Sequence, residues 1–196
     1  MKLSKGWIAA LAIVGIVLII GLWIGGTYNG LVSQQENVKA KWGNVQSAYQ
    51  RRADLIPNLV DTVKGAKNFE QQTLTQITQL RSQAGQIQQT VQGAQNPGQL
   101  QDAETQMGGV LSRLMVIVEA YPDLKSNENF LSLQDELAGT ENRIKTERDN
   151  YNTAVQSYNV AVRTFPSNII SGMFGFGVKE PFAADAGADK VPTVTF

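Results

Sequence analysis

The run of residues from Gly6 to Gly26, GWIAALAIVGIVLIIGLWIGG, contains 21 residues and no charged side chain. A helix of that length rises about 30 Å, close to the thickness of the hydrocarbon core of a bilayer. A cleaved signal peptide has a shorter apolar run and a small-residue exit site, and neither fits this segment. We therefore expect an uncleaved, single-pass membrane anchor. The side chains expected to lie within the membrane include Trp7, Ile8, Leu11, Val14, Val17, Ile20, Trp23 and Ile24.

The charges beside this run favour one orientation in the cell membrane. Lys2 and Lys5 precede the run, whereas Glu36, Lys39 and Lys41 are the first charges that follow it. Positive charges accumulate on the cytoplasmic side of membrane spans. The sequence thus favours an extracytoplasmic (periplasmic) location for the remaining chain. With so few charges, a cytoplasmic location stays open.

The composition excludes several classes of function. The chain of 196 residues has no cysteine and no histidine, and its 17 Lys and Arg balance its 17 Asp and Glu. Disulfides, zinc sites, thiol nucleophiles and Ser-His-Asp triads are therefore excluded. No basic surface is available for nucleic-acid phosphates, and the acidic residues fall at helical spacing typical of exposed charges. We expect no enzymatic activity, no cofactor, no metal ion and no nucleic-acid partner.

From Tyr28 onward, apolar residues recur at alternating steps of three and four, the pattern of packed helices. This predicts an all-α fold: an N-terminal transmembrane helix (residues 1–27), an elongated up-and-down four-helix bundle (28–165) and an apolar, irregular tail (166–196). The four series include Leu31, Val38, Val45, Tyr49, Arg52, Ile56, Leu59 and Val63; Ile77, Leu80, Ala84, Ile87 and Val91; Leu100, Ala103, Met107, Val110, Leu114 and Ile117; and Phe130, Leu133, Leu137, Thr140, Ile144, Tyr151, Ala154, Tyr158 and Phe165.

Proline and glycine mark the predicted helix ends. The first helix ends either near Asp54, with Pro57 opening the next helix, or at Gly65, with Pro57 inside it as a kink. An end near Asp54 makes the second helix about 38 residues long, so that it would overshoot the membrane plane by about 20 Å. We therefore favour Gly65. A helix that continues to Val91 in a three-helix arrangement stays open. The later ends are placed at Pro97, Pro122 and Pro166.

The sharpest polar grouping follows from that geometry. Counting helical rise from the membrane, Arg52 in the first helix lies level with Glu141 in the fourth and near Arg81 in the second. Together with Asp54, these residues are predicted to form a polar layer in the bundle. One interpretation is an ionic site for a small polar ligand. The favoured interpretation is a satisfied layer that fixes the register of the helices.

Two surfaces are candidate contacts with other protein chains. The second helix is rich in glutamine, and neutral amides allow lateral packing against other copies, although a solvated face is the simpler interpretation. The segment from Tyr121 to Lys125, at the membrane-distal end, is either a simple helix stop or a docking loop.

Apolar residues return in the tail. A cluster of apolar side chains near the start of the tail has two interpretations. If the fourth helix returns to the membrane, the cluster lies beside the lipid headgroups; alternatively, it covers the end of the bundle. The final residues, Val191 to Phe196, are either a strand that adds to a partner's sheet or a disordered end. The membrane-surface cluster consists of Ile169, Ile170, Met173, Phe174 and Phe176.

Further motifs are spread over nearly the whole chain. They are Tyr28-Asn29-x-Leu31-Val32, Trp42, Arg52-Ala-Asp-Leu-Ile-Pro-Asn-Leu-Val60, Arg113-Leu114, Glu119-x-Tyr-Pro-x-Leu-Lys125, Glu136-Leu-x-Gly-Thr-Glu-Asn142, Arg148-x-x-Tyr-Asn152, Tyr158-Asn159, Phe165-Pro166 and Met173-Phe-Gly-Phe176. Together they resemble the LemA family of bacterial membrane-anchored proteins. The resemblance implies a four-helix bundle and no established enzymatic activity. A relative in magnetotactic bacteria belongs to the machinery that forms magnetosome membranes, which points to membrane organisation.

We therefore expect a membrane-anchored structural protein that self-associates and organises or scaffolds membrane. Its expected partners are the lipid bilayer and other copies of the chain. The alternative is a membrane-tethered adaptor that recruits a protein partner through the membrane-distal loop or the C-terminal tail.

Overall fold

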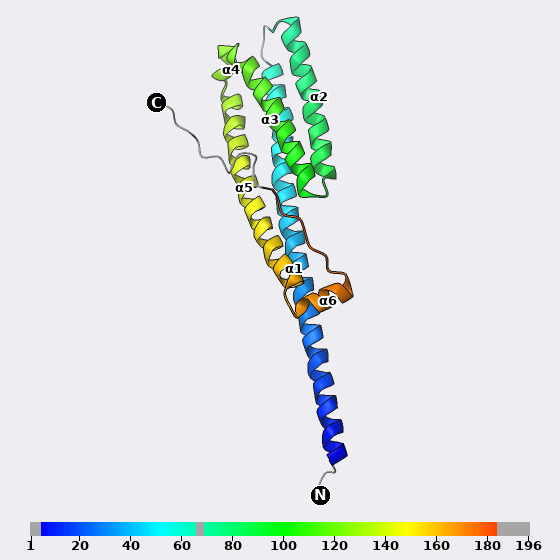
Figure 1. Ribbon diagram of the computed structural model, residues 1–196. Helices are drawn as coiled ribbons and strands as arrows, with labels where there is room; N and C mark the ends of the chain where they lie inside the picture. The colour runs from blue at the N-terminus through cyan, green and yellow to red at the C-terminus, as the bar shows by residue number, and fades with distance from the viewer. Residues whose placement is uncertain (1–4, 66–68, 184–196) are drawn as a thin grey trace, which may run out of the picture. The chain divides into compact units, whose positions relative to one another are not determined.

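The computed structural model describes residues 5–65 and 69–183, which are almost entirely helical (Figure 1). No strand occurs within these residues. The predicted all-α class, with one long apolar N-terminal helix and bundle-like packing, is confirmed. The elements in chain order are α1 (Lys5–Lys64), α2 (Gln71–Gly93), α3 (Pro97–Glu119), α4 (Pro122–Lys125), α5 (Glu128–Arg163) and α6 (Ser167–Phe174).

The helix boundaries follow from local chemistry. Helix α1 ends at Lys64, directly before Gly65, and contains Pro57 in its interior. Because α2 is a separate helix, α1 does not continue to Val91. Helix α3 opens with Pro97 after Asn96, whose side chain accepts a hydrogen bond from the Gln99 amide at 3.0 Å and so caps the helix.

The described residues form two compact units. One consists of residues 5–40 and 153–179, and the other of residues 41–65, 69–152 and 180–183. Helices α1 and α5 each contribute to both units, whereas α2, α3 and α4 lie wholly in the second and α6 wholly in the first. The predicted division into residues 1–27, 28–165 and 166–196 remains a prediction.

Among the described residues of the second unit, α1 contacts three other helices, α2, α3 and α5. Contacts from α1 reach α2 through Asp61 and Arg81, α3 through Tyr49 and Glu104, and α5 through Arg51. The buried positions of α2 and α3 coincide with the predicted apolar series. This agreement reflects the helical period of 3.6 residues, which places positions three and four apart on one face.

The fourth apolar series ends earlier than predicted. Tyr158 is buried, but Phe165 is 75% exposed. Helix α5 ends at Arg163, so Phe165 lies beyond the last helical turn and no longer follows the buried face. Tyr158 is the last fully buried member of the series.

Candidate functional site

The first part of α1 exposes its apolar side chains. Between Trp7 and Trp23, large residues such as Ile13, Ile19 and Leu22 are more than half exposed. Among the described residues, α1 is the one helix long and apolar enough to cross a membrane. From Leu31 onward one face of the helix is buried instead, beginning with Leu31, Val38 and Val45. One continuous helix therefore changes from an exposed apolar surface to a packed one.

A polar network joins α1, α3 and α5 in the second unit. Arg52 lies 3.3 Å from the Glu141 carboxylate and 3.8 Å from that of Glu104. Glu104 also accepts a hydrogen bond from the Tyr49 hydroxyl at 2.7 Å and pairs with Arg148 at 3.3 Å. The Arg52 side chain is 9% exposed and that of Arg148 is 12% exposed. Glu104 is thus the shared partner of two largely buried arginines and one tyrosine: it accepts hydrogen bonds from Tyr49 and Arg148 and forms an ion pair with Arg52.

The structure brings together only part of the predicted polar layer. Arg52 and Glu141 meet as expected, but Asp54 and Arg81 lie elsewhere. Asp54 follows Arg52 by two residues, which is about 200° around a helix, so it points to another side. It accepts hydrogen bonds from Gln50 and Gln88. Arg81 instead pairs with Asp61 at 2.9 Å on the exposed surface.

The network adjoins an aromatic site around Phe182, which no sequence pattern predicted. Phe182, which is 4% exposed, stacks against Trp42 and Tyr49 with ring centroids 6.1 and 6.4 Å apart. Tyr151 meets the Phe182 ring edge-on at 5.5 Å, and the Arg148 guanidinium lies 5.1 Å from its centre. Tyr49 and Arg148, both held by Glu104, therefore form two walls of the Phe182 site.

Side chains of α5 also hold the backbone of the tail. Asn152 accepts a hydrogen bond from the Phe182 amide at 2.8 Å and donates one to the Phe182 carbonyl at 3.3 Å. In the first unit, Asn159 makes the same pair of bonds with Lys179, both at 2.8 Å. The asparagines lie seven residues apart. Each side-chain amide pairs with both the N–H and the C=O of one tail residue, as a neighbouring strand does in a sheet. No apolar periodicity reveals such contacts, although both asparagines belong to motifs noted in the sequence.

Three tyrosines of the described residues have raised pKa values. For Tyr49, burial is the main cause, and the hydrogen bond and negative charge of Glu104 add to it. Burial raises the pKa of Tyr151, with a smaller contribution from Glu180, and burial alone raises the pKa of Tyr158. Each of these hydroxyls therefore stays neutral to a higher pH than an ordinary tyrosine does.

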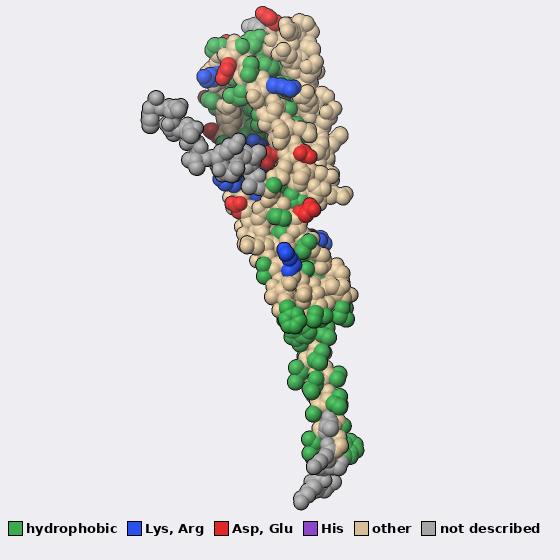
Figure 2. Space-filling view, viewed as in Figure 1, with side chains coloured by type: hydrophobic (Ala, Val, Ile, Leu, Met, Phe, Trp, Pro, Cys, Tyr) green, Lys and Arg blue, Asp and Glu red, His purple; other side chains and the backbone are tan. Residues whose placement is uncertain are grey.

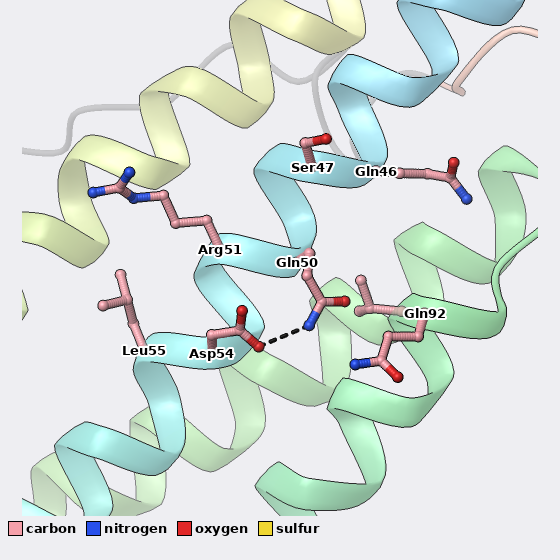
Figure 3. Close-up of a pocket in the computed structure, with 8 residues that line it drawn as sticks. Gln46, Ser47, Gln50, Arg51, Asp54, Leu55 and Gln92 are labelled. Atoms are coloured by element: carbon pink, nitrogen blue, oxygen red, sulfur yellow. Dashed lines mark hydrogen bonds between the residues drawn. The ribbon is translucent and has the colours of Figure 1, made fainter.

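A groove of about 530 Å³ lies between α1 and α2 (Figure 3). Gln50 and Asp54 face each other within it and are hydrogen-bonded at 2.7 Å. A second groove, of about 690 Å³, is lined by Glu104, Glu141, Lys145 and Arg148 beside the Phe182 site. Within the described residues, no group of three or more acidic side chains is placed to hold a metal ion.

The membrane-distal segment predicted as a docking loop forms the single turn α4. Tyr121 contacts the Phe69 ring at 4.7 Å, and its hydroxyl lies 3.4 Å from that of Thr73. Leu124 is 3% exposed. Tyr121 and Leu124 are thus already packed on the bundle. The predicted contact segment from Val191 to Phe196 lies outside the described residues.

The predicted membrane-surface cluster divides between two environments. Ile169, Met173 and Phe174 are at least half exposed. Ile170 is only 1% exposed and Phe176 is partly covered by Tyr28, with ring centroids 5.6 Å apart. The prediction that all five residues lie at a surface is therefore wrong for Ile170, because one face of α6 must pack on the protein.

These features define a helical-bundle protein that carries one N-terminal helix long and apolar enough to cross a membrane. Residues 41–196 match the family model described as the LemA family. The chain belongs to the LemA family.

Curated relatives agree with this assignment. Protein LemA of Metamycoplasma hominis is 30% identical over 158 residues, which cover 79% of this chain and 69% of the relative. Magnetosome protein MamQ 2 of Paramagnetospirillum magneticum is 26% identical over 215 residues, covering 99% of this chain and 79% of the relative. Magnetosome protein MamQ of Magnetospirillum gryphiswaldense is 27% identical over 187 residues, covering 86% and 68%.

Proposed function

We propose that this protein is a structural component of the cell membrane: α1 anchors it as a single span, and its bundles associate with one another to organise the bilayer. The observation that carries the proposal is the continuity of α1. Its exposed apolar residues up to Trp23 and its buried residues from Leu31 belong to one helix. A helix that leaves the proposed span without a break has no loop at the membrane surface, as suits a scaffold. The magnetosome association in the relatives' names is consistent with this role.

The outer face of α2 is the proposed contact between copies. Arg81 is the only charged residue in α2, and it is already paired with Asp61. An uncharged face repels a second copy little, and each glutamine amide offers both a donor and an acceptor to an identical face. The exposed glutamines are Gln71, Gln72, Gln76, Gln79, Gln86, Gln89 and Gln92.

The anchor is tested by alkaline extraction of membranes that contain the full chain. The double substitution Val14→Asp and Val17→Asp places two carboxylates in the proposed span, at a cost of about 2.5–3.5 kcal/mol each at its centre. We expect this variant to be released into the soluble fraction. Val116→Asp is the matched control, since Val116 is 65% exposed on the bundle and should leave extraction unchanged. Equal extraction of both variants would refute the anchor.

Self-association is tested with single cysteines, since the chain has none of its own. Gln79→Cys on the α2 face should form disulfide-linked dimers in membranes under mild oxidation. Ser132→Cys, on the exposed side of α5, is the control for random collision. Similar dimer yields at the two positions would argue against the α2 contact. Labelling Gln79→Cys in whole cells with a membrane-impermeant maleimide also tests orientation, and we expect labelling because the lysines before the span favour an extracytoplasmic bundle.

A further inference from the structure

We propose that α6 is a second membrane contact, which lies in the lipid headgroup region beside the anchor and inserts one edge into the bilayer. This inference rests on the proposed anchoring by α1. The segment from Thr164 to Val178 contains no charged residue, and Arg163 and Lys179 stand at its two ends. Figure 2 shows hydrophobic side chains gathered around α6 and continuing along the apolar part of α1.

Aromatic contacts fix α6 next to the end of the apolar run. Tyr28 meets Phe174 and Phe176 edge-on, with ring centroids 5.0 and 5.6 Å apart. Tyr28 lies two residues after Gly26, where the uncharged run stops. In α1, two residues correspond to about 3 Å of rise, so α6 is held at the level where the bilayer core would end.

One face of α6 is bound to the protein. Ile170 is buried, and the Ser171 hydroxyl donates a hydrogen bond to the Val162 carbonyl at 2.8 Å. The helix ends at Gly175, whose φ of 75° favours glycine, and the Phe176 amide bonds back to the Ser171 carbonyl at 2.9 Å. The orientation of α6 about its own axis is therefore fixed.

The outward half of α6 has an apolar edge and a polar edge. Ile169 is 51% exposed and Met173 is 70% exposed. At about 100° per residue they lie about 40° apart, whereas Asn168 lies about 140° from Met173. A helix that lies in a membrane interface has this division, with its apolar edge towards the acyl chains. If α6 only capped the bundle, the burial of Ile170 would be explained, but Met173 would still be 70% exposed among the described residues.

The residues on either side of α6 suit a membrane interface. Phe165 and Val178 are 75% and 60% exposed and extend the apolar surface at both ends of α6. Arg163 lies just before Phe165 and Lys179 just after Val178, and both are also exposed. Long cationic side chains beside an apolar surface reach the phosphates of lipid headgroups while their stems stay near the acyl boundary. The surface therefore fits a phospholipid bilayer.

The test uses the full chain in vesicles of phosphatidylcholine and phosphatidylglycerol. Single cysteines replace Met173 or, as the matched control in the same helix, Asn168, and each carries an environment-sensitive fluorophore. We expect the label at residue 173 to be quenched by phospholipid that is spin-labelled near the headgroup and to be shielded from quenching by aqueous iodide. The label at residue 168 should keep iodide quenching. Equal iodide quenching at both positions would overturn the proposal.

Alkaline extraction of the same vesicles separates this result from failure of the anchor. If the protein resists extraction while the label at residue 173 is open to iodide, α1 anchors the chain and α6 does not touch the bilayer. A Met173→Gln variant labelled at Ile169→Cys adds an independent readout. Loss of lipid quenching at residue 169, with extraction unchanged, is expected because a polar side chain on the inserted edge weakens insertion. Unchanged lipid quenching would contradict the inserted edge.

Discussion

Replacing Glu104 by glutamine should destabilise the bundle more than any other loss of a single carboxylate in the described network. The substitution keeps the size of the side chain and removes its charge. Glu104 accepts the hydrogen bond of Tyr49 at 2.7 Å and pairs with Arg148 at 3.3 Å and Arg52 at 3.8 Å. Both arginines are nearly nine-tenths buried or more, so water cannot replace the lost partner.

The magnitude follows from burial and from the contacts that remain. Removing one partner of a fully buried ion pair costs about 3–5 kcal/mol. Glu104 is 29% exposed, Arg52 keeps Glu141, and glutamine can still accept the Tyr49 hydrogen bond. We therefore expect a loss of about 2–3 kcal/mol in the free energy of unfolding. For a protein of this size each kcal/mol lowers the melting temperature by about 2–4 °C, which gives about 4–12 °C.

The assay is thermal unfolding of the full chain in mild detergent, followed by circular dichroism at the helical band. Glu136→Gln is the control, because Glu136 pairs with Arg51 at 2.6 Å but the two side chains are 40% and 64% exposed. An exposed pair of this kind contributes at most about 1 kcal/mol. If Glu104→Gln shifts the melting temperature no more than Glu136→Gln does, the network does not act as a buried charge cluster.

Three further outcomes follow from the tail and the tyrosines. Phe182→Ala should speed hydrogen exchange of the residue 182 amide, which Asn152 now protects, whereas Phe165→Ala at an exposed position should not. Tyr158→Phe should be neutral or stabilising, because the described residues place no hydrogen-bond partner at the buried Tyr158 hydroxyl, and a lower urea midpoint would contradict this. The free energy of unfolding should fall as pH rises above 10.0, the ordinary tyrosine pKa, because folding raises the pKa of Tyr49. The stability that Tyr49 contributes is complete below that pH and is lost as the tyrosine of the unfolded chain deprotonates. Urea midpoints measured over this pH range would show the loss.

Helical periodicity made most of the bundle predictable. The series from Ile77 to Val91 and from Leu100 to Ile117 coincides with the buried faces of α2 and α3. Helical rise also placed Arg52 level with Glu141 and favoured an end of the first helix at Gly65, and α1 ends at Lys64. These successes share a cause, since rise and rotation per residue are fixed in any α-helix.

The tail and the centre of the polar network could not be predicted in the same way. Phe182 reaches its site through a non-helical segment, whose path no sequence period determines. Glu104 is the shared partner of Tyr49, Arg148 and Arg52, yet it lies one residue after Ala103 of the apolar series and has the sequence pattern of a surface charge. Its role depends on Arg148 and Tyr49, which come from two other helices. Asp54 does not join the layer because two residues along an α-helix correspond to about 200° of rotation, so Asp54 and Arg52 point to different sides of α1.

The placement of Glu104 predicts that the polar network and the tail site are energetically one unit. Buried ion pairs rarely stabilise a fold by themselves, because desolvation offsets their attraction. Here Glu104 orients Tyr49 and Arg148, and both contact the Phe182 ring. Glu104→Gln and Phe182→Ala should therefore be non-additive, with a coupling energy of about 0.5–3 kcal/mol in a double-mutant cycle. The cycle of Glu136→Gln with Phe182→Ala should be additive. Additivity in both cycles would mean that the network only fixes helix register and that the tail packs independently of it.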